Sequence, residues 1–294
     1  MDDAIASYSS VLGLTGATFK RVDRVDSLVA VVYEVCRPGA APLILKICPR
    51  LGDYHRELYF LRMFAQELPV PAVVGSVPPS DELAGAVLMT RLPGASLQAA
   101  AMTDAIAYEL GSLLARIHLH RTARYGDLTT PTGLHEMALV PLRSKIEEAL
   151  AECEGHLSPA IVARCRHRLE QSAVRLERVD GPCIIHRDFR PSNIVVHAGR
   201  VQGIIDWASA RAGFAEEDFA AMQHDVWEHY PQSRDSFLAG YISIRPAPAY
   251  EDVMPLLCMQ RALAIVGMTV REGTWQGPDA YLYAKEKAFL EKLG

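Results

Sequence analysis

The sequence predicts an α+β fold of two lobes, a small antiparallel sheet with one helix followed by a larger, mainly helical lobe. Three observations lead to this prediction. Short valine-rich runs alternate with turns up to about residue 92, helical periodicity dominates from about residue 103, and a strand-rich stretch interrupts the helices at residues 182–205. Half of the 294 residues are hydrophobic, which is enough to build a core in each lobe.

The N-terminal lobe is predicted to begin with strands. Residues 28–35 are rich in valine and residues 43–47 form a second apolar run, so the two are predicted to pair as antiparallel strands around a proline–glycine turn. An apolar stripe at helical spacing predicts a helix over residues 53–67, which two prolines terminate. One more strand is predicted at residues 86–90, before a break at residues 92–94. We therefore divide the chain into residues 1–92 and residues 93–294.

The C-terminal lobe is predicted to be helical around a short group of strands. Four leucine and isoleucine residues spaced as i, i+3, i+4 and i+7 predict a core helix that ends near Ile117. Two more helices are predicted over residues 141–154 and 159–178, and the pattern from about residue 217 onward is again helical. The strands are predicted at residues 182–185, 193–197 and 201–205.

The composition argues against several classes of protein. A net charge of −5 and a pI near 6.1 are unusual for a nucleic-acid binder, which normally carries a clustered basic face. No apolar run approaches the ~20 residues that span a bilayer, and Met1-Asp2-Asp3 lacks the basic and then apolar order of a signal peptide. The six cysteines are scattered without a Cys-x-x-Cys pair, as expected of reduced thiols. We expect a cytoplasmic monomer or homodimer that binds neither nucleic acid nor membrane.

The strand-rich stretch holds the candidate chemistry. Residues 186–193 read His-Arg-Asp-Phe-Arg-Pro-Ser-Asn, and Asp206 follows the hairpin. Phosphoryl transfer needs metal ions that neutralise the phosphates and a carboxylate that orients and deprotonates the attacking hydroxyl. A carboxylate and a carboxamide five residues apart, Asp188 and Asn193, can supply one group to the nucleophile and one to Mg²⁺. Oxygen ligands of this kind suit Mg²⁺, which keeps several waters and takes other ligands from phosphate.

Residues 186–193 resemble the catalytic loop of protein-kinase-like enzymes, whose pattern is H-R-D-L-x-x-x-N. Asp206-Trp207 and Asp218-Phe219-Ala220 are similar to the aminoglycoside phosphotransferase family, a branch of small-molecule kinases in that superfamily. The resemblance covers roughly residues 20–225. It implies a two-lobed protein-kinase-like fold and Mg²⁺-dependent transfer of the γ-phosphoryl group of ATP or GTP to a hydroxyl.

The same resemblance implies a role for each polar residue of the loop. Asp188 would be the catalytic base, and Asn193 and Asp206 would be the metal ligands. Arg190 stands where protein kinases carry a lysine near the transferred phosphoryl group, so it would stabilise charge there. The alternative is a surface or core salt bridge for Arg190 and a loop-capping role for each acid or amide.

The N-terminal half supplies a complement to this loop. Lys46 lies inside the predicted strand at residues 43–47, where an isolated charge is costly to bury without a partner. Glu57 on the next helix is its natural partner. The resemblance makes Lys46 the lysine that contacts the α- and β-phosphates and Glu57 the glutamate that holds it. A lysine on the solvent face of an edge strand is the alternative.

Residues 87–94 resemble the interlobe hinge of the family, whose backbone binds adenine. On that resemblance the nucleotide is contacted by Met89, Thr90, Arg91 and Leu92, and residues 1–92 are the nucleotide-binding lobe. Two features depart from the family pattern. The expected glycine-rich phosphate loop is missing, since residues 22–28 contain no glycine and offer only the hydroxyl of Ser27. Arg187 stands where the family usually has glycine.

Two alternatives to a small-molecule kinase remain. A protein kinase fits residues 186–193 even at Pro191, but only eleven residues separate Asp206 from Asp218, which leaves no room for a typical activation segment. A pseudokinase would keep the fold as a binding module without the chemistry. The joint presence of the lysine, the glutamate and the three loop residues argues against it.

The acceptor is predicted to be a small hydroxyl-bearing molecule, first of all an aminoglycoside-type antibiotic, which would make the protein an antibiotic-resistance factor. Acidic residues cluster at residues 216–228, and a polycationic aminoglycoside would be attracted to them, with Asp225 and Glu228 as candidate contacts. A solvated helix face explains the same acidic run equally well. Macrolides, choline-like alcohols, homoserine and other sugars are alternative acceptors.

Overall fold

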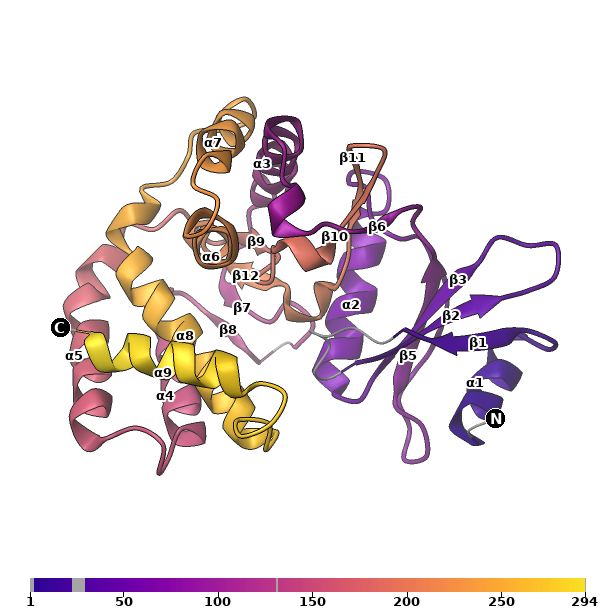
Figure 1. Cartoon of the computed structure of the whole chain (residues 1–294), viewed down its shortest axis with the longest axis horizontal. Helices are drawn as coiled ribbons and strands as arrows, with labels where there is room; N and C mark the ends of the chain where they lie inside the picture. Colours follow the sequence, from indigo (N-terminus) through magenta and orange to yellow (C-terminus); the bar gives the residue numbers. More distant parts are fainter. Residues whose placement is uncertain (1–2, 23–29, 131, 294) are drawn as a thin grey trace.

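The computed structural model of the chain describes residues 3–22, 30–130 and 132–293. Figure 1 shows a strand-rich N-terminal lobe beside a larger, mostly helical C-terminal lobe, which confirms the predicted α+β fold. Within the described residues, no helix combines the length and the apolar character that crossing a membrane requires.

Five antiparallel strands form the sheet of the N-terminal lobe. In spatial order they are β1 (Thr18–Arg21), β2 (Val31–Cys36), β3 (Leu43–Cys48), β5 (Gly85–Thr90) and β4 (Val73–Val77). Side chains alternate between the two faces of each strand. Val35 and Leu45 therefore point to the face that packs against helix α1 (Asp3–Val11), whereas Lys46 points to the opposite face.

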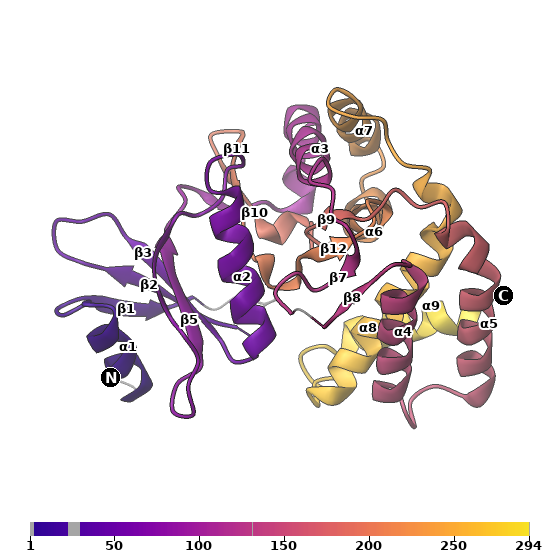
Figure 2. The same ribbon diagram turned by 180° about the vertical axis from the view of Figure 1, so that it is seen from behind.

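Helix α2 (Leu51–Phe64) lies between this sheet and the C-terminal lobe, as both views show (Figures 1 and 2). Phe60 and Phe64 pack against Trp207 of the C-terminal lobe, with ring centroids 6.1 and 4.9 Å away. Such buried aromatic contacts contribute about 0.5–1.5 kcal/mol each beyond the burial of area. Because α2 also carries Glu57, this packing fixes where that carboxylate lies.

Two small sheets flank residues 186–193. One contains β11 (Arg200–Ile204), β10 (Ile194–His197) and β6 (Ala95–Ser96), and the other contains β8 (Leu134–His135), β7 (Tyr125–Gly126), β12 (Arg211–Gly213) and β9 (Cys183–Ile185), each in spatial order. Residues 186–193 run from β9 of one sheet to β10 of the other. Asp206 follows β11 and precedes a short helical turn at Trp207–Ser209. The predicted loop and the predicted carboxylate thus lie at the ends of neighbouring strands.

The helices of the C-terminal lobe form two groups. Helices α4, α5, α8 and α9 gather at the end of the molecule far from the N-terminal sheet, around an apolar core of their own (Figures 1 and 2). Thr103 is the N-cap of helix α3 (Asp104–His118), and its side chain accepts a hydrogen bond from the backbone N–H of Ile106. The helices of this lobe are α3 (Asp104–His118), α4 (Leu139–Glu152), α5 (Pro159–Leu176), α6 (Glu216–Met222), the π-helical turn Gln223–Trp227, α7 (Ser233–Ile242), α8 (Met254–Arg271) and α9 (Ala280–Lys292).

Helices α3 and α7 touch through their backbones at two glycines. A Cβ atom on Gly111 would lie 1.9 Å from the carbonyl oxygen of Phe237, and one on Gly240 would lie 1.9 Å from the carbonyl oxygen of Tyr108. No side chain fits at either place. This close approach brings the end of α3, with His118, beside Tyr241 of α7.

The predicted helices and strands that fall within the described residues are present, with boundaries that differ from the prediction by three residues or fewer. Helix α1 and strands β1, β4, β6, β7, β8 and β12 are absent from the prediction. Strands β1 and β4 have four and five residues and lack a clean alternation of exposed and buried positions, so they carry little periodic signal. Ser27 and the start of the first predicted strand lie outside the described residues.

Candidate active site

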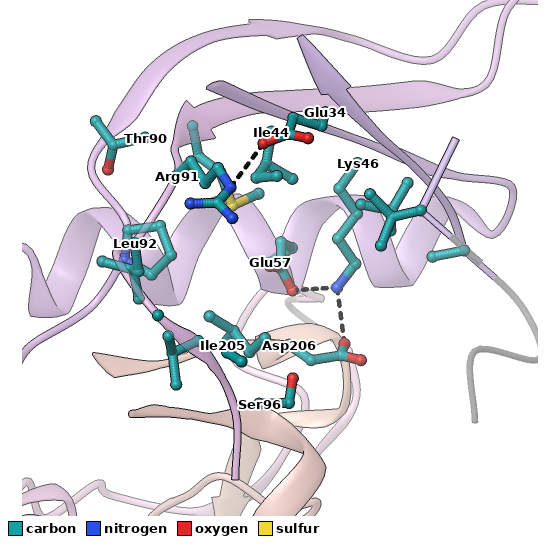
Figure 3. A pocket seen from close by; sticks show the side chains of 18 of the residues that line it. Glu34, Ile44, Lys46, Glu57, Thr90, Arg91, Leu92, Ser96, Ile205 and Asp206 are labelled. Atoms are coloured by element: carbon teal, nitrogen blue, oxygen red, sulfur yellow. Dashed lines mark hydrogen bonds and ion pairs between the residues drawn. The ribbon is translucent and has the colours of Figure 1, made fainter. Parts of the chain in front are cut away.

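A cavity of about 650 Å³ lies between the N-terminal sheet and the β10–β11 hairpin (Figure 3). One wall consists of alternate residues of β2 and β3, including Val32 and Ile44, and the opposite wall includes Val195 and Ile205. The predicted nucleotide residues within the described part of the chain all line this cavity. They are Lys46, Glu57, Met89, Thr90, Arg91 and Leu92. Asp206 lines it as well, so the fold brings the two halves of the predicted site to one place.

Lys46 joins the two lobes inside this cavity. Its Nζ atom donates to Glu57 Oε2 at 2.8 Å and to Asp206 Oδ1 at 2.7 Å (Figure 3). Lys46 and Glu57 are almost fully buried, with 6% and 1% of their surfaces exposed. Burial lowers the pKa of Lys46, but the carboxylates of Asp206 and Glu57 outweigh it, so the pKa is raised and the ammonium stays charged. Burial also raises the pKa of Glu57, and the ammonium of Lys46 opposes that shift.

The ion pair leads to a testable coupling. Lys46→Ala should lower kcat/KM for the nucleotide, and Glu57→Gln should reproduce part of that loss, because Glu57 acts through the ammonium that it holds. In a double-mutant cycle on kcat/KM the interaction should amount to about 1 kcal/mol or more, the usual scale for residues in contact. Strictly additive losses would show that the two residues act independently.

At the other end of the cavity a side chain of β2 meets the residue that follows β5. Arg91 Nε lies 2.8 Å from Glu34 Oε1, and both residues line the cavity (Figure 3). Thr90 closes the end of β5 by hydrogen bonds between its backbone N–H and Ala72 O and between Ala72 N–H and its own hydroxyl. Glu34 was not among the predicted site residues. The strand alternation would have found it, because Glu34 shares the face of β2 that carries Val32.

The loop at residues 186–193 gathers its polar groups around Asp188. The Nδ2 of Asn193 donates to Asp188 Oδ2 at 2.7 Å and to Asp188 O at 3.0 Å. Arg190 Nε lies 3.1 Å from Asp188 Oδ1. The carboxylate of Asp188 remains about a quarter exposed, as does Arg190, so an incoming hydroxyl can reach it. Asp188, Arg190 and Asn193 are thus brought together as predicted.

A buried carboxylate holds the start of this loop. Asp218 accepts the backbone N–H of His186 at 2.8 Å and that of Arg187 at 2.5 Å. A carboxylate only accepts, so His118 Nε2 donates to Asp218, at 3.1 Å, and its Nδ1 faces the hydroxyl of Tyr241 at 2.8 Å. Nothing local in the sequence indicates this chain of contacts, since its members lie on α3, α6 and α7.

The backbone of the loop explains the glycine of the family pattern. Arg187 has φ = 66°, in the left-handed region where a side chain costs about 1 kcal/mol or more and glycine costs nothing. The guanidinium of Arg187 lies 4.0 Å from Glu217, whose carboxylate also pairs with Arg211 at 2.6 Å. The positive charge of Arg211, together with burial, lowers the pKa of Arg187 to about 10, which leaves it charged at neutral pH.

The oxygen atoms near the cavity suit Mg²⁺. Both hydrogen bonds of the Asn193 side chain use its Nδ2, so its Oδ1 is the atom that can accept a metal ion. The side chain of Asp206 is 39% exposed, and it faces the cavity with one oxygen on Lys46. Within the described residues, His, Cys, Asp and Glu side chains form no group of three that could hold a metal by themselves. One carboxylate and one carboxamide fit an ion that takes its remaining ligands from phosphate and water.

The acidic run at residues 216–228 is not a solvated helix face, because much of it is buried in ion pairs and hydrogen bonds. Glu216, Glu217 and Asp218 are 3%, 8% and 0% exposed. Asp225 is paired with Arg261 at 2.7 Å and with His224 Nδ1 at 2.7 Å, so its charge is already compensated. Glu228 is exposed. An acceptor contact of Asp225 or Glu228 stays a prediction, and for Asp225 a cation would have to compete with Arg261.

The network around Asp225 makes stability depend on pH. Burial lowers the pKa of His224, but hydrogen bonds to Asp225 and to Glu286 outweigh it and raise the pKa to about 9. A raised folded-state pKa gives stabilisation that is fully present below the ordinary value of 6.5 and is lost as pH rises through 9. The loss should be on the order of 2–3 kcal/mol in the free energy of unfolding.

His224→Gln should remove most of this pH dependence between pH 6.5 and 9.5. The measurement is urea-induced unfolding at both pH values. His229→Gln serves as the matched control, because His229 is an exposed histidine five residues away in the same region. An equal pH dependence in the wild type and in His224→Gln would show that another group carries it.

Comparison with known proteins places the chain in a family. A homoserine kinase of Gluconobacter oxydans (strain 621H) is 29% identical over 218 residues, which are 71% of this chain and 66% of that enzyme, slightly less than two thirds of its length. The crystal structure of aminoglycoside phosphotransferase APH(4)-Ia has a TM-score of 0.72 and 15% identity, with 99% of each chain covered. Macrolide 2′-phosphotransferase MphH from Brachybacterium faecium has a TM-score of 0.62 and 16% identity, covering 99% of this chain and 98% of that one.

The two structures show a shared fold. The family model for the phosphotransferase enzyme family matches residues 27–256, which include Lys46, the loop at residues 186–193 and Asp206. The predicted family is thereby confirmed: this chain belongs to the phosphotransferase enzyme family.

Proposed function

We propose that the protein is a kinase that transfers the γ-phosphoryl group of ATP or GTP to a hydroxyl group of a small molecule. The observation that supports this most is the position of Lys46, which contacts Glu57 and Asp206 at once in a cavity of nucleotide size. A pseudokinase has no need to keep this pair together with Asp188 and Asn193. In the solved complex of APH(4)-Ia with AMP-PNP and hygromycin B, a nucleotide analogue and an acceptor bind one related fold.

Each residue of the site has a task in this proposal. Residues 1–92 bind the nucleotide, with Lys46 on the phosphates and residues 89–92 along the base, while residues 93–294 supply the catalytic loop and the acceptor site. Asn193 and Asp206 would hold Mg²⁺, which neutralises phosphate charge when bound. Asp188 orients the acceptor hydroxyl and takes its proton, and Arg190 stabilises charge on the transferred group.

A homoserine-like acceptor has more support than an aminoglycoside. The sequence argument for a polycation rested on the acidic run, and the structure uses most of that run inside the fold. The homoserine kinase shares 29% identity, whereas the aminoglycoside enzymes share 14–16% and support the fold alone. All six cysteines are free thiols, and we place the reaction in the cytoplasm, where ATP is available and thiols stay reduced.

The test is an acceptor screen with the purified protein, Mg²⁺ and either ATP or GTP. Homoserine, hygromycin B, a macrolide, choline and simple sugars are compared by acceptor-dependent release of the nucleoside diphosphate and by mass analysis of the product. Phosphorylated homoserine is the expected product, and Asp188→Asn is the control for contaminating kinases. Nucleotide binding without phosphorylation of any acceptor would favour the pseudokinase instead.

A further inference from the structure

Arg56 lies beside Glu57 on α2 and reaches the C-terminal lobe. Its Nε donates to Ala208 O at 2.5 Å, and its Nη1 donates to Asp127 Oδ2 at 2.6 Å. Its Nη2 donates to Asp53 Oδ1, one turn earlier on the same helix, at 2.6 Å. One guanidinium therefore joins the helix of the N-terminal lobe to two separate segments of the C-terminal lobe, and one of them is the turn that begins at Asp206.

Asp127 is itself held in place. Its Oδ1 accepts the backbone N–H and the hydroxyl of Thr129, at 2.8 and 2.6 Å, while its Oδ2 accepts from Arg56. Burial raises the pKa of Asp127, but the bonds from Thr129 and Arg56 outweigh burial and lower the pKa, so the group is a carboxylate at neutral pH. The pair is about one-fifth exposed on each side, which makes it stronger than a fully solvated surface pair.

The chain also leaves room for this guanidinium. Gly52 is the second residue of α2, and a Cβ atom there would lie 2.9 Å from Arg56 Nη1 and 3.3 Å from Nη2. Glycine in a helix costs up to about 1 kcal/mol relative to alanine. The backbone of Gly52 does not require glycine, since its φ is not in the left-handed region. A side chain at position 52 would therefore displace the Arg56 head group from its present place.

We propose that Arg56, anchored by Asp127, is a positioning residue. It holds α2 and the turn that begins at Asp206 at the separation that Lys46 needs to contact both Glu57 and Asp206. The proposal rests on the proposed kinase function. Lys46 can contact both carboxylates only while α2 and the turn stay at their present separation. Arg56 is adjacent to Glu57 on α2, and it donates to the carbonyl oxygen of Ala208, which lies two residues after Asp206. Asp206 has φ = 68°, in the left-handed region that residues with a side chain adopt rarely.

Four variants test the proposal, with two readouts for each. Arg56→Met and Asp127→Asn should each raise the Mg²⁺ concentration for half-maximal activity and lower kcat, by roughly tenfold, the scale of residues that support a metal ligand. Arg56→Lys should be more active than Arg56→Met but less active than the wild type, because a lysine ammonium cannot donate to all three acceptors in this geometry. Gly52→Ala should also lower kcat, because the new methyl group displaces the guanidinium, yet its melting temperature should not fall. Arg62→Met is the control, an exposed arginine on the same helix.

The second readout is the affinity for AMP-PNP as a function of Mg²⁺, measured by calorimetry, which needs no acceptor. If the wild type phosphorylates no acceptor, the proposed function fails, and the calorimetry still decides the role of Arg56. Wild-type kcat and wild-type Mg²⁺ dependence in Arg56→Met would overturn the positioning role. Full activity of Gly52→Ala would also overturn it. A double mutant Arg56→Met/Asp127→Asn whose loss of activity equals the sum of the two single losses would overturn it as well, because it would show no coupling.

Discussion

Replacement of Asp188 by asparagine is expected to lower kcat by about 10²-fold or more and to leave nucleotide affinity nearly unchanged. A positioned general base contributes roughly 10²–10⁴-fold to the rate. Asparagine keeps the shape of the side chain, and its oxygen can still accept the hydrogen bond from Asn193. It cannot take the proton of the acceptor hydroxyl. Asp188 does not line the nucleotide cavity, so affinity for AMP-PNP should stay within a few-fold of the wild type.

The measurement combines kcat at saturating acceptor with calorimetric nucleotide affinity. Asp81→Asn is the matched control, since Asp81 is an exposed aspartate in the loop between β4 and β5. A near-normal kcat in Asp188→Asn, measured with metal and contaminating kinases excluded, would remove Asp188 from the role of base. The partly exposed Arg190–Asp188 pair would then be no more than a structural contact.

Loss of Asp206 is expected to impair metal use more than loss of Asn193. Asp206→Ala should raise the Mg²⁺ requirement and lower kcat/KM on the order of 10²-fold or more, since metal stabilisation of phosphate charge amounts to several kcal/mol. Asn193→Ala removes a neutral ligand and should have a smaller effect. Magnesium titrations of activity measure both.

Asp206 has a second task that the experiment must separate from metal binding, because Lys46 donates to it across the lobes. Asp206→Asn keeps the size of the side chain and an oxygen for Lys46 but brings no charge to the metal. If Asp206→Asn strongly raises the Mg²⁺ requirement, the role of Asp206 is metal binding. If Asp206→Asn has normal activity while Asp206→Ala has lost it, the role of Asp206 is the contact with Lys46. An unchanged Mg²⁺ requirement in Asp206→Ala would place the metal elsewhere.

Much of the fold and of the catalytic loop could be predicted because their signals are local. The stripe that predicts α3 lies within eight residues, and Asp188 and Asn193 are held together by the few residues between them. The pairing of Lys46 with Glu57 was predicted from the cost of burying a charge together with the family resemblance, and the two atoms lie 2.8 Å apart. For such features the local sequence, the resemblance and the cost of burial are sufficient.

The acidic run shows where local reasoning fails. A helix with consecutive acids was interpreted as an acceptor surface or a solvated face, but Glu217 is buried because Arg211, on β12, supplies its partner. Glu216 accepts the backbone N–H of Asp180, which lies 36 residues earlier. The burial of a charge is decided by partners that only the fold brings near. The same holds for Arg56, since two of its three acceptors, Ala208 and Asp127, lie far away in the sequence.

The contact between α3 and α7 also bears on how the enzyme is made. The hydrogen bonds that hold His186 and Arg187 run through Asp218 and His118 to Tyr241, and the last step spans 123 residues of sequence. A nascent chain that has emerged only as far as the turn at Trp207–Ser209 contains Asp188, Asn193 and Asp206 but lacks Asp218 and Tyr241. On the ribosome, where synthesis proceeds at ~5–20 residues per second, the motif is therefore complete in sequence before its loop can be braced. The whole chain of hydrogen bonds behind the loop can form only after α7 has left the exit tunnel and packed against α3.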